Sequence, residues 1–278
     1  MKKRRFFATA FEPHAPFWIE SIGFNPDQEP IRRPTGYGWY HWLQTKDGEG
    51  EAIIGERVYR LLPTSGLMLL PHTPHRYYAV GGGRWSTFYL TFGGPLAAQA
   101  TAVLGIDADR VYRWDAGCPL DRAVPDAALR LTSRRRLSGL DLSVEVYRFL
   151  VALKRYGRPD GVAVSIDRLE QRIAPLLAWL DRHFANPDVG VADMADVLGV
   201  SPRHLRELFK RVYGCSPYRY LLGQRLRRAK ERLLSYPDEP VRTVAERVGF
   251  RDAGHFIAAF RKAENMTPEQ FRKLHLRR

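Results

Sequence analysis

The chain has 278 residues, enough for two ordinary domains that each bury a core. Hydrophobic residues make up 45% and charged residues 27%, as in globular proteins, and no apolar run approaches the roughly 18 residues needed to cross a bilayer. The basic start MKKRRFF is followed by no continuous apolar stretch, which argues against a secretory signal. We therefore expect a cytoplasmic globular protein that does not enter the membrane.

The net charge of +14 is unevenly distributed along the chain. Residues 201–278 hold 19 Lys and Arg against 8 Asp and Glu, which places +11 there and leaves +3 for the preceding 200 residues. A generally basic surface would spread its charge evenly. A concentrated positive field attracts phosphate, so the C-terminal part is expected to bind nucleic acid.

Short strands broken by Gly and Pro are predicted up to about residue 94. Side chains alternate from Tyr37 to Leu43 and from Trp85 to Phe92, which is typical of strands in a small barrel or sandwich. After Gly94 the pattern becomes helical. Helices are predicted in PLAAQATAVLGI, in PLDRAVPDAALRLTSRRR and in GLDLSVEVYRFLVALKRYG.

The last of these segments carries an apolar stripe on adjoining helical turns, which comprises Leu140, Val144, Tyr147, Leu150 or Val151, and Lys154. Such a stripe packs either within its own domain or against a second subunit. The segment RPDGVAVS, residues 158–165, then has the composition of a linker.

Residues 194 to 214, MADVLGVSPRHLRELFKRVYG, predict two helices joined by a tight turn. Gly199 can adopt the positive φ of the turn. Ser201 can accept a hydrogen bond from a free amide of the second helix, and Pro202 suits its first position. Leu205 and Phe209 recur at helical spacing and are expected to face a core. A helix, a tight turn and a helix with a basic outer face form the helix-turn-helix pattern.

The same pattern occurs a second time about 50 residues later. Val191, Ala195 and Gly199 match Val241, Ala245 and Gly249, and after one extra residue the match continues at Leu205/Phe256, Phe209/Phe260, Pro217/Pro268 and Tyr220/Phe271. Between the copies, SPYRYLLGQRLRRAKERLLSY has helical periodicity and precedes Pro237. One helix of about 18 residues spans roughly 27 Å, close to the 34 Å between successive major grooves.

These residues resemble the DNA-binding domain of the AraC/XylS family of bacterial transcription regulators over residues 166–276. The matching signature begins with Ala195, Gly199, Ser201, Leu205 and Phe209 and continues through Gly249, Phe250, Phe256, Phe260, Pro268 and Arg272. The resemblance implies double-stranded promoter DNA and RNA polymerase as partners. It favours an activator, although the residues themselves do not fix the sign of regulation.

The family's base-reading positions fall on the exposed face of the second helix of each unit. In the first unit they are Arg203, Arg206 and Glu207, with His204 and Lys210 nearby. Arginine can bind guanine O6 and N7 with two hydrogen bonds, and glutamate can accept one from cytosine N4. Each residue alone is equally well explained as a solvated surface charge, but their cluster on one helix favours DNA reading.

The second unit departs from this pattern. Its helix, DAGHFIAAF, has Ala253, Gly254 and Ala258 at positions where family members often carry polar readers. His255 remains as a hydrogen-bonding side chain, and Arg251 and Arg261 are the basic residues expected to contact DNA. Asp252 is the expected N-cap of this helix. We expect this unit to position the protein on phosphates, with apolar contact or DNA shape adding selectivity.

The segment DGEGEAIIGERVYRLLPTSGLMLLPHTPHRY resembles the cupin-like effector domain of the same family, and the segment from Arg33 to Gly50 aligns without gaps with its arabinose-responsive member. The resemblance places Arg33, Tyr77, Thr87 and Tyr89 in the effector site. The arabinose-responsive member carries different residues at the positions of Thr87 and Tyr89, which argues against arabinose itself as the ligand. Aromatic faces and hydrogen-bond donors for a hydroxyl-rich ligand remain. We expect a sugar or a glycoside. Tyr89 is equally well explained as a plain core residue.

A metal-dependent or sugar-active cupin enzyme is the alternative. His41, His72 and His75 are present, but they form no His-x-His pair followed by an acidic residue. Cys118 and Cys215 belong to no CxxC pair and are read as reduced thiols. The residues therefore predict no enzyme activity, no metal and no cofactor. A regulator whose first domain dimerises without a ligand is a further alternative.

The predicted fold class is α+β with two domains. Residues 1–157 form a cupin-like β-barrel with following helices, for effector binding and dimerisation, and residues 158–165 form a linker. Residues 166–278 form an all-α domain with helix-turn-helix units near 191–213 and 241–263. The predicted function is a sugar-responsive, homodimeric regulator of a carbohydrate-utilisation operon.

Overall fold

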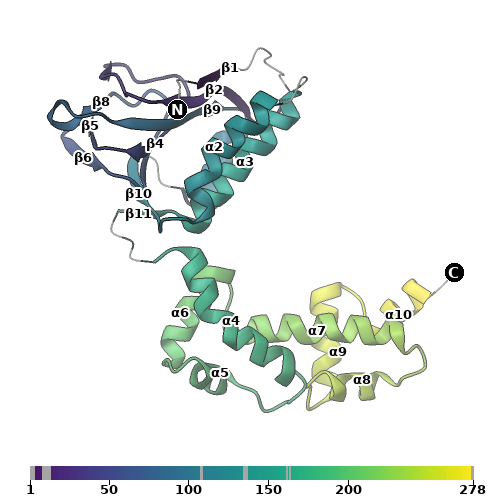
Figure 1. Ribbon diagram of the computed structural model, residues 1–278. Helices are drawn as coiled ribbons and strands as arrows, with labels where there is room; N and C mark the ends of the chain where they lie inside the picture. The colour runs from purple at the N-terminus through teal and green to yellow at the C-terminus, as the bar shows by residue number, and fades with distance from the viewer. Residues whose placement is uncertain are drawn as a thin grey trace. The chain divides into compact units, whose positions relative to one another are not determined.

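A computed structural model of the chain describes residues 4–7, 14–106, 109–133, 137–160, 162 and 164–276. The chain divides into two compact units, Met1–Asp167 and Arg168–Arg278 (Figure 1). Each unit buries its own hydrophobic clusters. The predicted fold class, a sheet-rich domain followed by a helical one, is confirmed.

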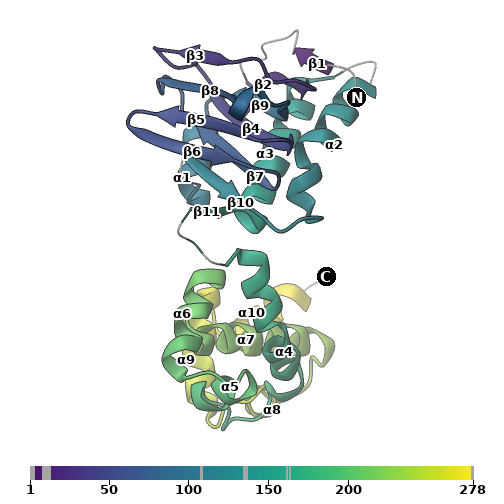
Figure 2. The same ribbon diagram turned by 60° about the vertical axis from the view of Figure 1, so that its left-hand side comes forward.

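Two antiparallel sheets packed face to face form a sandwich in the N-terminal unit (Figure 2). Within the described residues, one sheet has seven strands in the order β1-β2-β9-β4-β7-β10-β11, and the other has four in the order β3-β8-β5-β6. The strands are β1 (Arg4–Phe7), β2 (Trp18–Asn25), β3 (Ile31–Arg33), β4 (Tyr40–Asp47), β5 (Gly50–Ile54), β6 (Arg57–Leu61), β7 (Ser65–Leu69), β8 (His75–Ala79), β9 (Ser86–Gly93), β10 (Arg110–Arg113) and β11 (Arg158–Pro159).

Both faces of the seven-stranded sheet are covered, and successive side chains point to opposite faces. Along β4, Leu43 belongs to the cluster between the two sheets, whereas Tyr40 and Trp42 belong to the cluster under the helices. Along β9, Tyr89 faces the second sheet and Leu90 faces the helices. This alternation assigns one set of side chains to the interior of the sandwich and the other to helix packing.

Helices α1 (Ala97–Leu104), α2 (Pro119–Ser133) and α3 (Gly139–Tyr156) follow the sheets at the positions that the sequence predicts. Helices α2 and α3 lie against the outer face of the seven-stranded sheet (Figure 1). Trp42 of β4 packs on Phe149 of α3 with ring centroids 5.3 Å apart. Burial of each such side chain contributes roughly 1.5–3 kcal/mol.

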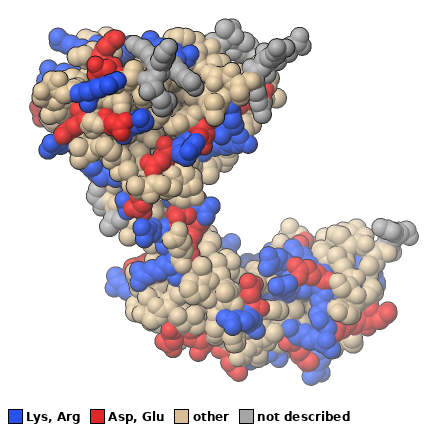
Figure 3. Space-filling model, in the orientation of Figure 1, with Lys and Arg blue, Asp and Glu red and all other residues tan. Residues whose placement is uncertain are grey.

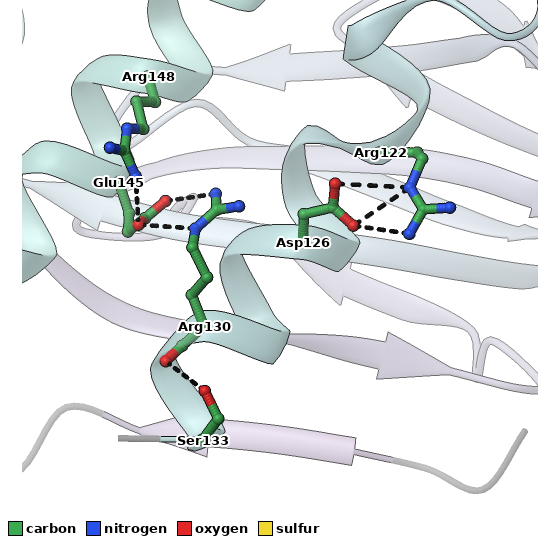
Figure 4. Close-up of polar contacts among 6 residues, drawn as sticks. All are labelled: Arg122, Asp126, Arg130, Ser133, Glu145 and Arg148. Carbon is green, nitrogen blue, oxygen red and sulfur yellow. Dashed lines mark hydrogen bonds and ion pairs between the residues drawn. The ribbon is translucent and has the colours of Figure 1, made fainter. Parts of the chain in front are cut away.

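An ion cluster joins α2 to α3 (Figure 4). The Glu145 carboxylate is 8% exposed and accepts hydrogen bonds from Arg130 Nε and Nη2, at 2.9 and 2.7 Å, and from Arg148 Nη1 at 3.1 Å. A buried carboxylate needs such partners, because burying it unpaired would be very unfavourable. The cluster fixes which side of α3 faces α2, and Leu140, Val144, Tyr147 and Val151 then remain exposed.

Two expectations for this unit were wrong. The chain does not become purely helical after Gly94, because β10 pairs with β7 and extends the sheet. The segment 158–165 is not a linker from its first residue, because Arg158 and Pro159 form β11 and pair with β10. Both strands are shorter than the windows in which alternation is recognisable, and their pairing partners lie far away in the sequence.

The C-terminal unit is helical throughout its regular elements. Its helices are α4 (Ile166–His183, which begins just before the division), α5 (Val191–Val197), α6 (Pro202–Tyr213), α7 (Pro217–Ser235), α8 (Val241–Arg247), α9 (Ala253–Glu264) and α10 (Pro268–Leu276). One hydrophobic cluster joins α4, α5, α6 and the start of α7, and another joins the rest of α7 with α8, α9 and α10. The continuous helix predicted between the two sequence repeats is therefore confirmed as α7.

Two residues fix the arrangement of the two hydrophobic clusters: Arg225 of α7, and Gly249, which follows α8. The Arg225 guanidinium, near the middle of α7, donates to the carbonyl oxygens of Phe184 and Asn186, both at 2.8 Å. Gly249 has φ +88, and a Cβ there would lie 2.4 Å from the Phe184 oxygen. The turn after α8 therefore requires glycine both for its backbone conformation and for its close approach to the loop after α4.

Candidate DNA-reading helices and candidate effector pocket

The exposed face of α6 is the first candidate DNA-reading surface. The Ser201 hydroxyl accepts a hydrogen bond from the His204 amide at 3.2 Å, which confirms the predicted N-cap, and Gly199 has the predicted positive φ. Leu205 and Phe209 are fully buried. The turn, the cap and the buried stripe together determine which side chains of α6 face solvent.

Four of the predicted reading side chains lie on that exposed face, and His204 is half-buried beside them. The side chains of Arg203 and Glu207 are 89% and 62% exposed, and Arg203 Nε lies 3.2 Å from Glu207 Oε1. An exposed pair of this spacing contributes only about 0.3–0.5 kcal/mol, so both groups can turn to base edges at little cost. Arg206 and Lys210 are exposed on the adjoining turns.

Helix α9 is the corresponding element of the second unit. The Asp252 carboxylate accepts from the His255 amide at 2.7 Å and caps the helix as predicted. His255 and Arg261 are exposed. The Arg251 side chain, just before the helix, forms an ion pair with Asp188, which lies just before α5. On the face shown in Figure 3, Lys and Arg of the helical unit are interleaved with acidic side chains rather than gathered in one patch.

The candidate effector pocket is a cavity of about 640 Å³, measured out to its open mouth, inside the N-terminal sandwich. Its lining comes from β1, β2, β3, β4, β8 and β9 and from the loops that carry Gln28 and Tyr37. Strand pairing brings the key side chains together: Arg33 lies opposite His75 across β3 and β8, and His41 lies opposite Thr91 across β4 and β9. A concave cavity lined by aromatic rings and a few polar groups is typical of small-molecule sites.

Aromatic rings form one wall of the pocket. The His41 ring is nearly parallel to that of Tyr77, with centroids 6.4 Å apart and planes at 5°, and its centroid lies 6.2 Å from that of Tyr89. The His75 ring continues the series at 5.9 Å from Tyr77. Such ring faces suit the C–H face of a sugar or another flat apolar surface, while the ring edges supply polar atoms.

Burial disfavours the charged form of both histidines in this wall. Burial, together with the positive charges of a protonated His75 and of Arg33, lowers the pKa of His41 from 6.5 to about 3. His41 Nδ1 lies 2.8 Å from Thr91 Oγ1, and its buried Nε2 has no hydrogen-bond partner among the described residues. Burial also lowers the pKa of His75, whose Nδ1 lies 2.7 Å from the Thr73 oxygen. A ligand with a hydroxyl near His41 Nε2 would satisfy that atom.

Arg33 lies at the mouth of the cavity. Its side chain is exposed, and its guanidinium carbon lies 4.4 Å above the centroid of the Tyr37 ring. The pKa of Tyr37 is raised to about 12 by burial and by its hydrogen bond to Glu20. The stacked, anchored ring holds the guanidinium at the cavity mouth and leaves its N–H groups free to reach a ligand.

The structure brings together three of the four effector residues expected from the sequence, namely Arg33, Tyr77 and Tyr89. Thr87 is not among the residues that line the cavity. It is fully buried, and its hydroxyl donates a hydrogen bond to Gln28 Oε1 at 2.7 Å. Thr87 therefore contacts the lining residue Gln28 rather than the cavity itself, and its expected role in effector binding stays a prediction.

The sequence analysis did not single out Tyr37. It considered His41 only as a metal candidate, and it interpreted His75 as a turn or pocket-rim residue. Two signals could have placed the histidines: His41 shares the strand phase of Leu43, and His75 shares that of Tyr77. Among the described residues, no three His, Cys, Asp or Glu side chains are arranged to hold a metal ion. Within the same residues, no helix is both long and apolar enough to cross a membrane.

Comparison with known proteins gives each unit a family. Residues 20–150 match the AraC-like ligand binding domain, and residues 194–274 match a helix-turn-helix domain. The chain is 37% identical over 126 residues to the HTH-type transcriptional activator RhaS of Enterobacter sp. (strain 638), which covers 45% of this chain and 43% of that one. RhaS of Citrobacter koseri matches to the same extent. The chain thus spans less than half the length of the curated relatives it matches.

Among solved structures, the C-terminal domain of AraT, a response regulator from Geobacillus stearothermophilus, is 33% identical. That match covers 38% of this chain and 88% of the other, with a TM-score of 0.37. Along the chain, the ligand-binding match comes before the helix-turn-helix match, as the sequence predicts. The chain belongs to the AraC/XylS family.

The pKa of His41 generates a prediction for the variant His41→Gln. Because the folded protein binds a proton on His41 only near pH 3, the unfolded chain takes it up first as the pH falls below 6.5. Stability that is present above pH 6.5 is therefore lost as the pH falls toward 3. We expect the wild type to lose about 1 kcal/mol more than His41→Gln between pH 7.5 and pH 5.5.

Urea unfolding of the full chain, followed by tryptophan fluorescence, measures this difference, because five of the six tryptophans lie before residue 115. The variant's lower absolute stability is irrelevant, since only the pH dependence is compared. Equal pH dependence in the two proteins would show that His41 is not buried in a neutral state.

Proposed function

We propose that this protein is a transcription regulator that binds promoter DNA through α6 and α9. The observation that carries the proposal is the repeated, capped recognition helix with an exposed outer face, in a segment whose net charge is +11. Arg203, Arg206 and Glu207 are the expected base-reading residues, with Arg261 and Lys210 among those near the phosphates. RNA polymerase is the expected further partner.

The effector in this proposal is a small hydroxyl-rich molecule, a sugar or a glycoside. Support comes from the aromatic wall of Tyr77, Tyr89 and His41, and from the guanidinium of Arg33 at the mouth of the same cavity. Effector binding would change how domains or subunits are arranged, so that both recognition helices engage tandem half-sites of a carbohydrate-utilisation operon.

The same proposal includes a homodimer formed through α3. Leu140, Val144, Tyr147 and Val151 are 61%, 48%, 51% and 40% exposed, and their spacing of four, three and four residues is that of a coiled-coil seam. Leu150, which the sequence left as an alternative to Val151, is fully buried in the domain. A second copy presents the same stripe, so two α3 helices can cover each other.

DNA binding is tested with the full chain and duplexes selected from a random-sequence library. We expect enrichment of a defined sequence and affinity that falls steeply with salt. Arg206→Ala should reduce discrimination at one base pair by about 1–3 kcal/mol, because a bidentate contact is lost, with little change on random DNA. Arg122→Ala, which removes an exposed arginine of α2, is the control. Failure to enrich any sequence, together with salt-insensitive binding, would refute the main proposal.

Effector binding is tested by calorimetry with aldopentoses, aldohexoses and their methyl glycosides. Arg33→Ala should weaken binding of an active sugar by about 1.5–3 kcal/mol, the range for a charged hydrogen bond, and leave ligand-free DNA binding intact. Unchanged affinity would remove Arg33 from the site. If none of these sugars binds the wild type, the sugar hypothesis is wrong and a regulator without a sugar effector is left.

Dimerisation is tested by analytical ultracentrifugation of Val144→Asp. A carboxylate in the middle of the stripe would have to be buried unpaired in the seam, so we expect the dimer to dissociate. Val103→Asp is the matched control, because Val103 of α1 is 80% exposed and lies outside the stripe. A wild-type monomer, or a Val144→Asp dimer of unchanged stability, would contradict this interface.

A further inference from the structure

Helices α6 and α9 correspond position by position at an offset of 51 residues. Both have 12 residues and begin after a capping side chain, Ser201 or Asp252, that accepts from the third following amide. Both end at a left-handed residue, Gly214 or Asn265. The fully buried pair Leu205 and Phe209 matches the fully buried pair Phe256 and Phe260. Equal caps and equal buried positions mean that the outward faces also correspond.

On those faces the chemistry differs. At the same offset, Arg203, Arg206 and Glu207 of α6 are replaced in α9 by Gly254, Ile257 and Ala258, all of which are exposed. Ile257 is 36% exposed, a large apolar side chain on the outside of a helix whose two phenylalanines, Phe256 and Phe260, are fully buried. The reading face of α9 is therefore apolar where that of α6 is charged.

An apolar side chain cannot exchange hydrogen bonds with base edges. In the major groove the C5-methyl of thymine is the apolar group that a base pair presents, and small or aliphatic side chains are its usual contacts. Basic residues flank this face, with Arg251 before α9 and Arg261 and Lys262 in its last turn, where they can approach phosphates on either side. The charge around the apolar face thus fits DNA better than an apolar protein partner.

We propose that α9 reads thymine methyl groups, with Ile257 as the main contact and Ala258 beside it. The inference rests on the proposed DNA-binding function. It assigns to the second unit a direct selectivity for thymine at defined positions of its half-site, while α6 selects by hydrogen bonding.

The test uses the duplex selected by the full chain and replaces its thymines one at a time by deoxyuridine, which lacks the methyl group. At one or two thymines in one half-site, wild-type affinity should fall about three- to five-fold, as expected for one buried methyl group. Ile257→Ala should bind more weakly to the thymine duplex and show no difference between thymine and deoxyuridine at those positions. Arg206→Ala, at the equivalent position of α6, should keep the difference.

Each other outcome has a defined meaning. If a duplex is selected but every deoxyuridine substitution is neutral, or if Ile257→Ala keeps the wild-type difference, thymine reading by α9 is wrong and the proposed DNA-binding function stands. If the selected half-sites contain no thymine, the inference is equally overturned. If no duplex is selected, the proposed function itself fails. Ile257 is partly exposed, so the variant should fold, and circular dichroism confirms this before binding is measured.

Discussion

The alternation of side chains along β4 and β9 decides what each face of the N-terminal unit contacts. One set of side chains, with Trp42 at its centre, packs against α3, and the other set, which includes His41, faces the cavity. Adjacent residues of one strand therefore contact the candidate effector site and the helix of the candidate dimer seam. A single sheet separates the two, which is the shortest path that this architecture offers between a bound molecule and a subunit interface.

Strand pairing holds the polar side chains of the cavity in place. His41 and Thr91 are cross-strand neighbours, and so are Arg33 and His75, so each polar group has a fixed position before any ligand arrives. Preorganisation of this kind reduces the entropy lost on binding. The surroundings of His41 also disfavour its charged form, because aromatic rings bury the side chain and a cation lies nearby.

The sequence was most informative where a local rule acts within a few residues. The N-caps Ser201 and Asp252 and the turn glycine Gly199 were predicted because each depends on its own neighbours. Strands β10 and β11 were missed because their partners come from distant segments and neither is long enough to show a period. For the candidate pocket, the gap-free segment pointed to Arg33, which lines the cavity, whereas Thr87 lies behind the lining, because an aligned position does not show how deep a side chain lies.

In the two helix-turn-helix units, folding constrains the buried positions but not the exposed ones. Their buried positions keep the same character, because each helix must fill the same small core with residues such as Phe209 and Phe260. Their exposed positions share no such constraint, because an arginine or an alanine in solvent changes stability by less than about 0.5 kcal/mol. The chain can therefore hold two recognition helices on one continuous α7 and still give them opposite chemistry, charged on α6 and apolar on α9. In the function proposed above, that division lets one domain distinguish two half-sites by two different kinds of contact.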